Sequence, residues 1–196
     1  MIMKKIISHI IRTMVILAMA VTVTGCGSST DEAGGGKESA YADALSVLTA
    51  VVGAYTGDDL FAMYGGDQAN AVMDAPGKFD ISKTQELELT LGLPPEQAGS
   101  VDDAASMVHL MNANTFTGAV YHLKDGTDKE AFAEAFKTYT MGRQWICGQP
   151  DTLLIVDVDG AYVITAYGEA ETMELFKSNA LSALTGAQVM LESPIA

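Results

Sequence analysis

The sequence has few of the residues from which disulfide frameworks, zinc sites and phosphate loops are built. It contains two cysteines and three histidines in 196 residues. Two cysteines cannot form the disulfide framework of a small secreted domain, and three histidines, of which His9 lies near the N-terminus, do not form a zinc-ligand pattern. The longest run of glycines, residues 34–36, has no strand before it, so a phosphate-binding loop is excluded. We therefore expect no metal site and no cofactor.

Basic residues are also scarce. The chain has 11 lysines and arginines against 25 aspartates and glutamates, and three of the basic residues lie in the first twelve positions. Without residues 1–25 the chain carries eight basic and 25 acidic residues, a net charge of −17. Such a chain repels phosphate backbones and anionic lipid headgroups, so we expect no nucleic-acid partner and no purely electrostatic attachment to a membrane.

The sequence has no apolar run long enough to be a comfortable membrane span. The longest, residues 13–24, follows Lys4, Lys5 and Arg12 and covers twelve positions, whereas a spanning helix needs about 20. A basic start, a short apolar run and small residues at its end are the three parts of a secretory signal. The N-terminus is therefore interpreted as an export signal.

The signal ends in Val23-Thr24-Gly25-Cys26, which resembles the lipobox of bacterial lipoproteins. The resemblance implies that residues 1–25 are removed and that Cys26 is diacylated, which anchors the protein to the cell membrane on its extracytoplasmic side. Residues 26–38 are rich in Gly and Ser and carry no large apolar side chain, so they are interpreted as a flexible tether. The rest, 39–196, resembles the single acidic domain of small uncharacterised bacterial lipoproteins.

Hydrophobic periodicity predicts helices and two strand pairs in this domain. Apolar spacing favours helices over 41–55, 82–91, 127–141 and 169–184, with a further short helix near 68–73, and β-rich runs predict hairpins formed by 105–111 with 115–123 and by 152–158 with 161–167. Asp159-Gly160 is a turn sequence of the second hairpin. We therefore predict an α+β fold, a two-layer sandwich in which an antiparallel sheet of about four strands carries its helices on one face.

Cys147 invites comparison with thiol chemistry. Trp145, Cys147, Gly148 and Pro150 resemble a thioredoxin-like site in composition, but the second cysteine that such a site needs is replaced by Pro150. If Cys26 carries lipid, Cys147 has no disulfide partner. We expect a buried thiol and indole; the alternative is a nucleophile with His109 or His122 as its base.

Two polar groups at the ends of predicted strands are candidate binding residues. The first comprises Asn112, Asn114 and Thr115, and the second Arg143, Gln144 and Trp145 beside Cys147. Loops at strand ends often carry binding residues. For Arg143, the alternative is an ion pair with one of the many carboxylates.

The sequence contains no coherent catalytic set, which favours a non-catalytic module that binds an unidentified protein or small molecule. The alternatives are a thiol-dependent enzyme and an accessory subunit of a transporter or envelope complex.

Overall fold

The computed structural model describes residues 39–57 and 59–196. The predicted signal, Cys26 and the tether lie outside the described residues. The helices have the bounds α2 Ala44–Val52, α3 Thr84–Leu91, α4 Lys129–Gly142 and α5 Ala170–Ala183, with a 3₁₀ turn η1 at Pro95–Ser100. The strands are β1 Met63–Gly65, β2 Val72–Met73, β3 Gly77–Lys78, β4 Val101–His109, β5 Phe116–Leu123, β6 Thr152–Val158, β7 Tyr162–Gly168 and β8 Gln188–Pro194.

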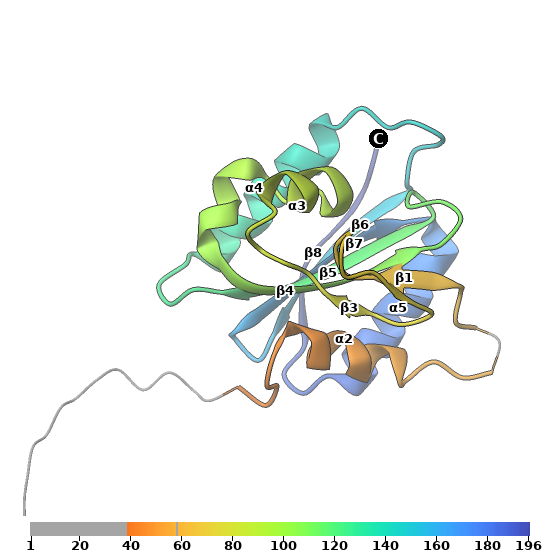
Figure 1. The fold of residues 1–196 in the computed structure, drawn as a ribbon, viewed down its shortest axis with the longest axis horizontal. Helices are drawn as coiled ribbons and strands as arrows, with labels where there is room; N and C mark the ends of the chain where they lie inside the picture. Colours follow the sequence, from red (N-terminus) through yellow and green to blue (C-terminus); the bar gives the residue numbers. More distant parts are fainter. Residues whose placement is uncertain (1–38, 58) are drawn as a thin grey trace, which may run out of the picture. The chain divides into compact units, whose positions relative to one another are not determined.

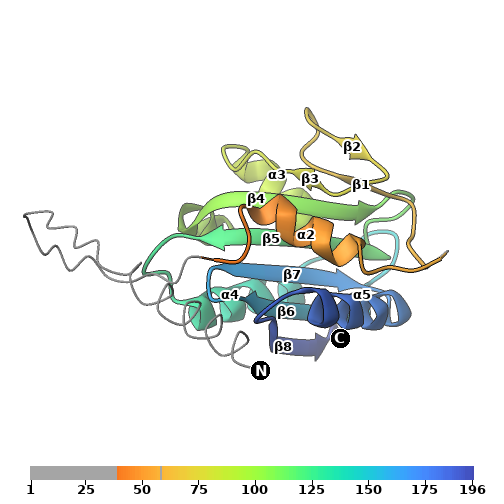
Figure 2. The same cartoon turned by 90° about the horizontal axis from the view of Figure 1, so that it is seen from below.

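The strands form one antiparallel sheet in the order β2-β1-β4-β5-β7-β6-β8, with β3 paired to β4 (Figure 2). The α+β class and both predicted hairpins are confirmed. Asp159 and Gly160 both have positive φ, 53° and 77°, as the predicted turn between β6 and β7 requires. The prediction of about four strands is wrong, because the described residues form eight.

The prediction of helices on one face is also wrong. Helices α3 and α4 cover one face of the sheet, and α2 and α5 cover the other (Figure 1). All seven residues of β7 and seven of the eight in β5 are buried, and side chains of a strand alternate between the two faces. Both faces of these strands therefore need a cover, and the domain has three layers rather than two.

The two helix layers enclose separate cores. Phe116, Ile164 and Phe176 belong to the core beneath α2 and α5, and Tyr121, Phe132 and Val163 to the core beneath α3 and α4. Burial of a large apolar side chain stabilises the fold by about 1.5–3 kcal/mol. Both helix pairs are thus bound to the sheet by extensive apolar packing.

The predicted short helix near 68–73 is wrong. Residues 67–70 form a turn instead, in which the N–H of Asn70 donates to the carbonyl of Asp67 at 3.0 Å, and Val72–Met73 is strand β2. Gly66, with φ of 86°, begins this turn, because a glycine adopts positive φ without steric cost. The turn connects β1 and β2 at one edge of the sheet.

Two glycines allow β1 to approach β3 closely. A Cβ built on Gly65 would lie 2.1 Å from the backbone N of Gly77 and 2.5 Å from the carbonyl O of Ser106. Both contacts are with backbone, which cannot rotate away as a side chain can. The close approach of β1 to β3 therefore requires glycine at position 65. This approach also fixes the positions of the segments before β2 and after β3.

We predict that Gly65→Ala lowers the free energy of unfolding by about 3 kcal/mol, because the added methyl group forces two backbone segments apart. Gly99→Ala is the matched control, since a Cβ on Gly99 meets nothing within 4 Å, and its effect should stay within about 0.5 kcal/mol. Denaturant unfolding measures both values; equal stabilities of the two variants would contradict the close approach.

Candidate functional site

The structure brings the two predicted groups of binding residues together. The side-chain amide of Asn114 donates to the carbonyl oxygens of Ile146 and Gly148, each at 2.6 Å, and that of Asn112 donates to the carbonyl of Cys147 at 3.4 Å. The loop after β4 therefore holds the loop after α4. These asparagines bind the protein's own backbone, so their structural role is to position the loops.

Thr115 has a similar role one residue further on. Its hydroxyl donates to Oε1 of Glu169 at 3.2 Å, and its carbonyl accepts from the N–H of Glu169 at 3.0 Å. Glu169 is the N-cap of α5. The loop after β4 is thus joined to the start of this helix as well as to the loop after α4.

Arg143 lies against aromatic rings and the end of α3. It donates to the carbonyl of Leu89 at 2.6 Å and to the hydroxyl of Tyr167 at 3.2 Å, and its guanidinium carbon is 5.1 Å from the ring centroid of Trp145. The alternative that Arg143 pairs with a carboxylate finds no support among the described residues. A cation here satisfies a carbonyl in the last turn of α3 and interacts favourably with the helix dipole.

Cys147 is exposed, so the expectation of a buried thiol is wrong. The preceding Ile146 is 81% exposed, and Cys147 has a positive φ of 66° in a loop that leaves both side chains outside the core. Nδ1 of His109 accepts from the N–H groups of Met111 and Asn112, both at 3.3 Å. Within the described part of the chain no hydrogen bond joins this thiol to a histidine, so the structure adds no support for a thiol-dependent enzyme.

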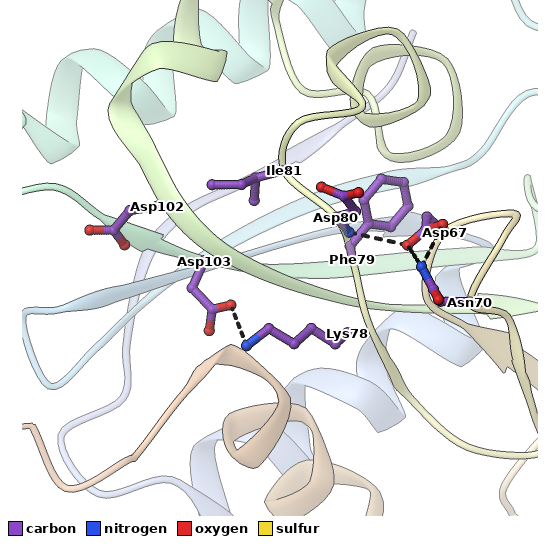
Figure 3. Close-up of a pocket in the computed structure, with 8 residues that line it drawn as sticks. All are labelled: Asp67, Asn70, Lys78, Phe79, Asp80, Ile81, Asp102 and Asp103. Atoms are coloured by element: carbon purple, nitrogen blue, oxygen red, sulfur yellow. Dashed lines mark hydrogen bonds and ion pairs between the residues drawn. The ribbon is translucent and has the colours of Figure 1, made fainter.

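A second candidate region, which sequence analysis missed, is a pocket of about 560 Å³ beside β3 and the start of β4 (Figure 3). It lies where the turn after β1, the segment after β3 and the first residues of β4 meet. Its lining residues are Asp67, Asn70, Lys78, Phe79, Asp80, Ile81, Asp102 and Asp103.

Asp67 is the structural centre of one wall of this pocket. Its carboxylate is buried and accepts from Lys83 Nζ, from Asn70 Nδ2 at 2.9 Å and from the backbone N–H groups of Ala69 and Asp80 at 3.0 and 3.2 Å. Burial alone would raise the pKa of Asp67, but the hydrogen bonds from Lys83, Asn70 and the two amides together hold that pKa well below its usual range. The ionised carboxylate therefore ties the turn after β1 to the segment after β3.

The charges of the pocket are not balanced. Asp67 is neutralised by Lys83, and Asp103 lies 3.2 Å from Lys78. Asp80 accepts hydrogen bonds from Ser82, which lower the pKa of Asp80 and keep it ionised. Oδ1 of Asp102 lies 2.5 Å from Nδ1 of His122. No lysine or arginine among the described residues forms an ion pair with Asp80 or Asp102.

Two apolar side chains, Phe79 and Ile81, complete the lining (Figure 3). A pocket with an apolar wall and two carboxylates without a lysine partner suits a ligand that has a positive charge on a small apolar body. Among residues 39–57 and 59–196, no three acidic, histidine or cysteine side chains are grouped so that they could hold a metal ion. The carboxylates are therefore spread along the pocket.

Sequence reasoning found the loops because they flank long, strongly patterned strands. It missed the pocket because β1, β3 and the turn after Gly66 are too short to show a period. The available signals were Gly65-Gly66-Asp67 and Asp102-Asp103, a glycine pair that permits close approach and adjacent carboxylates at a strand start. Neither indicates by itself that the two segments meet.

Comparisons with protein-family models, with curated proteins and with solved structures find no match to this chain. In the part of the chain that the structure describes, no helix is long and apolar enough to cross a membrane.

We predict that Asp67→Asn lowers the free energy of unfolding at pH 7 by about 3 kcal/mol, because removal of one member of a buried ion pair leaves the other without its partner. The pKa of Asp67 is lower in the folded than in the unfolded state. The ionised carboxylate therefore stabilises the fold fully above pH 3.8, the usual pKa of an aspartate, and this stabilisation is lost as the pH falls below 3.8. The difference between wild type and variant should therefore narrow in acid.

Denaturant unfolding between pH 7 and pH 2.5 tests this prediction. Glu192→Gln is the control, because Glu192 forms an exposed ion pair with Lys177 at 3.0 Å, and such pairs contribute about 1 kcal/mol or less. A pH-independent loss of stability in the Asp67 variant would argue against the role of its charge.

Proposed function

We propose that this protein is a lipid-anchored extracytoplasmic domain that binds, without catalysis, a small cationic ligand with an apolar body in the pocket beside β3. The observation that carries the proposal is the pocket of about 560 Å³, where Asp80 and Asp102 line the same pocket as Phe79 and Ile81 and neither carboxylate has a lysine or arginine partner among the described residues. The anchor is lipid on Cys26, as the resemblance to the lipobox implies.

The balance of charge supports a cationic ligand. Between residues 39 and 196 the sequence has seven basic and 22 acidic side chains. Each of the seven contacts an acceptor of the same domain: Lys78 with Asp103, Lys83 with Asp67, Lys124 with the carbonyl of Gly99, Lys129 with Asp157, Lys137 with Glu134, Arg143 with the carbonyl of Leu89, and Lys177 with Glu174 and Glu192. The cations are thus engaged internally, and the surplus of carboxylates attracts positive ligands.

The first described residues pack against the turn between β6 and β7. The N–H of Ala40 donates to Oδ2 of Asp159 at 2.8 Å, and the hydroxyl of Tyr162 donates to the carbonyl of Tyr41 at 3.2 Å. These contacts hold the start of the domain against the turn between β6 and β7. The first described residues therefore lie at the end of the strands where β6 turns into β7.

We predict that phenethylamine, which joins an ammonium group to an aromatic ring, binds this pocket and that phenylacetate, an anion of similar size, does not. The D80N/D102N variant should bind phenethylamine about tenfold more weakly, because it removes two partly exposed carboxylates that each contribute about 0.7 kcal/mol. Titration followed by amide NMR should show shifts at 78–81 and 102–103. Calorimetry of the same samples gives the affinities.

The D125N/E171Q variant is the control, because it changes the net charge equally through two exposed residues that do not line the pocket. It should bind as wild type does. Equal weakening in both double variants would show that only the overall charge attracts the amine, and equal binding of phenylacetate would exclude the proposed ligand class.

The lipid anchor has a separate test in cells. We predict that Cys26→Ser moves the protein from the detergent phase to the aqueous phase of a detergent partition, or leaves an uncleaved precursor, because the acylated thiol is lost. Cys147→Ser removes the other cysteine and should leave partitioning and processing unchanged. If Cys26→Ser behaved as Cys147→Ser does, the lipobox interpretation would be wrong.

A further inference from the structure

Exposed apolar side chains gather at the end of the strands that lies away from Tyr41. Leu110, Met111 and Ile146 are 40, 82 and 81% exposed, and Cys147 beside them is exposed too. We call the surface formed by these four residues the distal face. It belongs to the loops after β4 and after α4, which lie at the opposite strand ends from the β6–β7 turn (Figure 2).

The distal face is held in shape by hydrogen bonds beneath it. Asn114 donates to the carbonyls on both sides of Cys147, and Asn112 donates to the carbonyl of Cys147 itself. The N–H of Leu110 donates to the carbonyl of Ala62 at 2.9 Å, which fixes the start of the first loop. The apolar side chains are therefore presented on backbone segments that polar contacts hold in place.

Apolar exposure of this kind needs an explanation. Single exposed apolar residues are ordinary, but contiguous ones on ordered loops mark an interaction surface. The side chains of Met111 and Ile146 are four-fifths exposed although neighbouring Phe116 is fully buried. The fold thus buries apolar groups efficiently at this end and leaves these two outside.

Carboxylates lie beside the distal face. Glu169 accepts the hydroxyl of Thr115, the residue after Asn114, and Asp151 closes the loop after α4, where it accepts from the N–H of Ala170 at 2.9 Å. Both are exposed, and neither forms an ion pair with a lysine or arginine in the described residues. A complementary surface therefore has an apolar centre with positive charges around it.

We propose that the distal face docks a protein partner through a segment whose large apolar side chains alternate with lysine or arginine. A second copy of this chain is disfavoured, because it would bring the same carboxylates and a like net charge to the interface. An anionic bilayer is disfavoured by the same net negative charge.

The test uses three fluorescent peptides of equal length: one alternating Leu and Lys, one alternating Leu and Glu, and one alternating Ser and Lys. Binding to residues 26–196 is measured by anisotropy in 150 mM salt, where the Debye length of about 8 Å reduces long-range attraction. Only the Leu/Lys peptide should bind well. The M111S/I146S variant should weaken this binding at least about tenfold, which corresponds to the loss of about 1.4 kcal/mol of apolar contact.

L181S/V189S is the matched control, because Leu181 and Val189 are also exposed, at 40 and 41%, but lie on α5 and β8. It should bind the Leu/Lys peptide within about twofold of wild type. Both variants replace exposed residues, and an unchanged denaturation midpoint shows that each is folded.

Three results would overturn the proposal. Equal binding of the Leu/Lys and Ser/Lys peptides would mean that charge alone acts. Light scattering that shows a dimer in wild type and a monomer in M111S/I146S would assign the face to a second copy. Binding of the wild type without its lipid to vesicles with anionic headgroups, lost in M111S/I146S, would assign it to a bilayer. Titration of the pocket with phenethylamine tests the proposed function separately from the distal face, since no residue of the distal face lines that pocket.

Discussion

The burial of β7 and β5 on both faces is the constraint on which the rest of this structure depends. Tyr162–Gly168 is buried without interruption, and a strand in that position stays out of water only if each face of the sheet is covered. The two helix pairs meet this need, with Phe176 of α5 on one face and Phe136 of α4 on the other. Because the centre is occupied in this way, the binding surfaces that the fold can offer lie at its margins, along the strand edges and at the strand ends.

The two candidate regions use those margins differently. The pocket forms where β1 and β3 approach each other at two glycines, and a buried carboxylate, Asp67, fixes its wall by accepting hydrogen bonds from four donor groups. The distal face forms where loops leave long strands, and side-chain amides of Asn112 and Asn114 hold it. In both places polar side chains are occupied with other groups of the protein itself. Their neighbours are left to face a ligand.

This division explains how much could be predicted from the sequence. The four long strands and four helices follow from periodicity over seven or more residues, a signal that survives without an alignment. The strands β1, β2 and β3 have only two or three residues each, and β8 is half-exposed with a bulge against Ile155 and Val156, so neither group shows a regular pattern. The near-continuous apolar runs at 152–158 and 161–167 are typical of strands buried on both sides. Strands of this kind need helices on both faces of the sheet, and the sequence analysis did not predict this.

The candidate residues show the same limit at the scale of a side chain. Residues 112–115 lie between β4 and β5, at the strand ends where they were predicted, whereas residues 143–147 follow the end of α4. The hydrogen bonds that join the two loops span more than 30 positions, and no local pattern contains such a contact. Cys147 was expected in the core because free cysteines usually are. Its neighbours override that tendency, since Asn114 holds the carbonyls before and after it and Gly148 takes a φ of 108°. The backbone of the loop is thereby bound to the rest of the domain, and the side chains of Ile146 and Cys147 remain exposed.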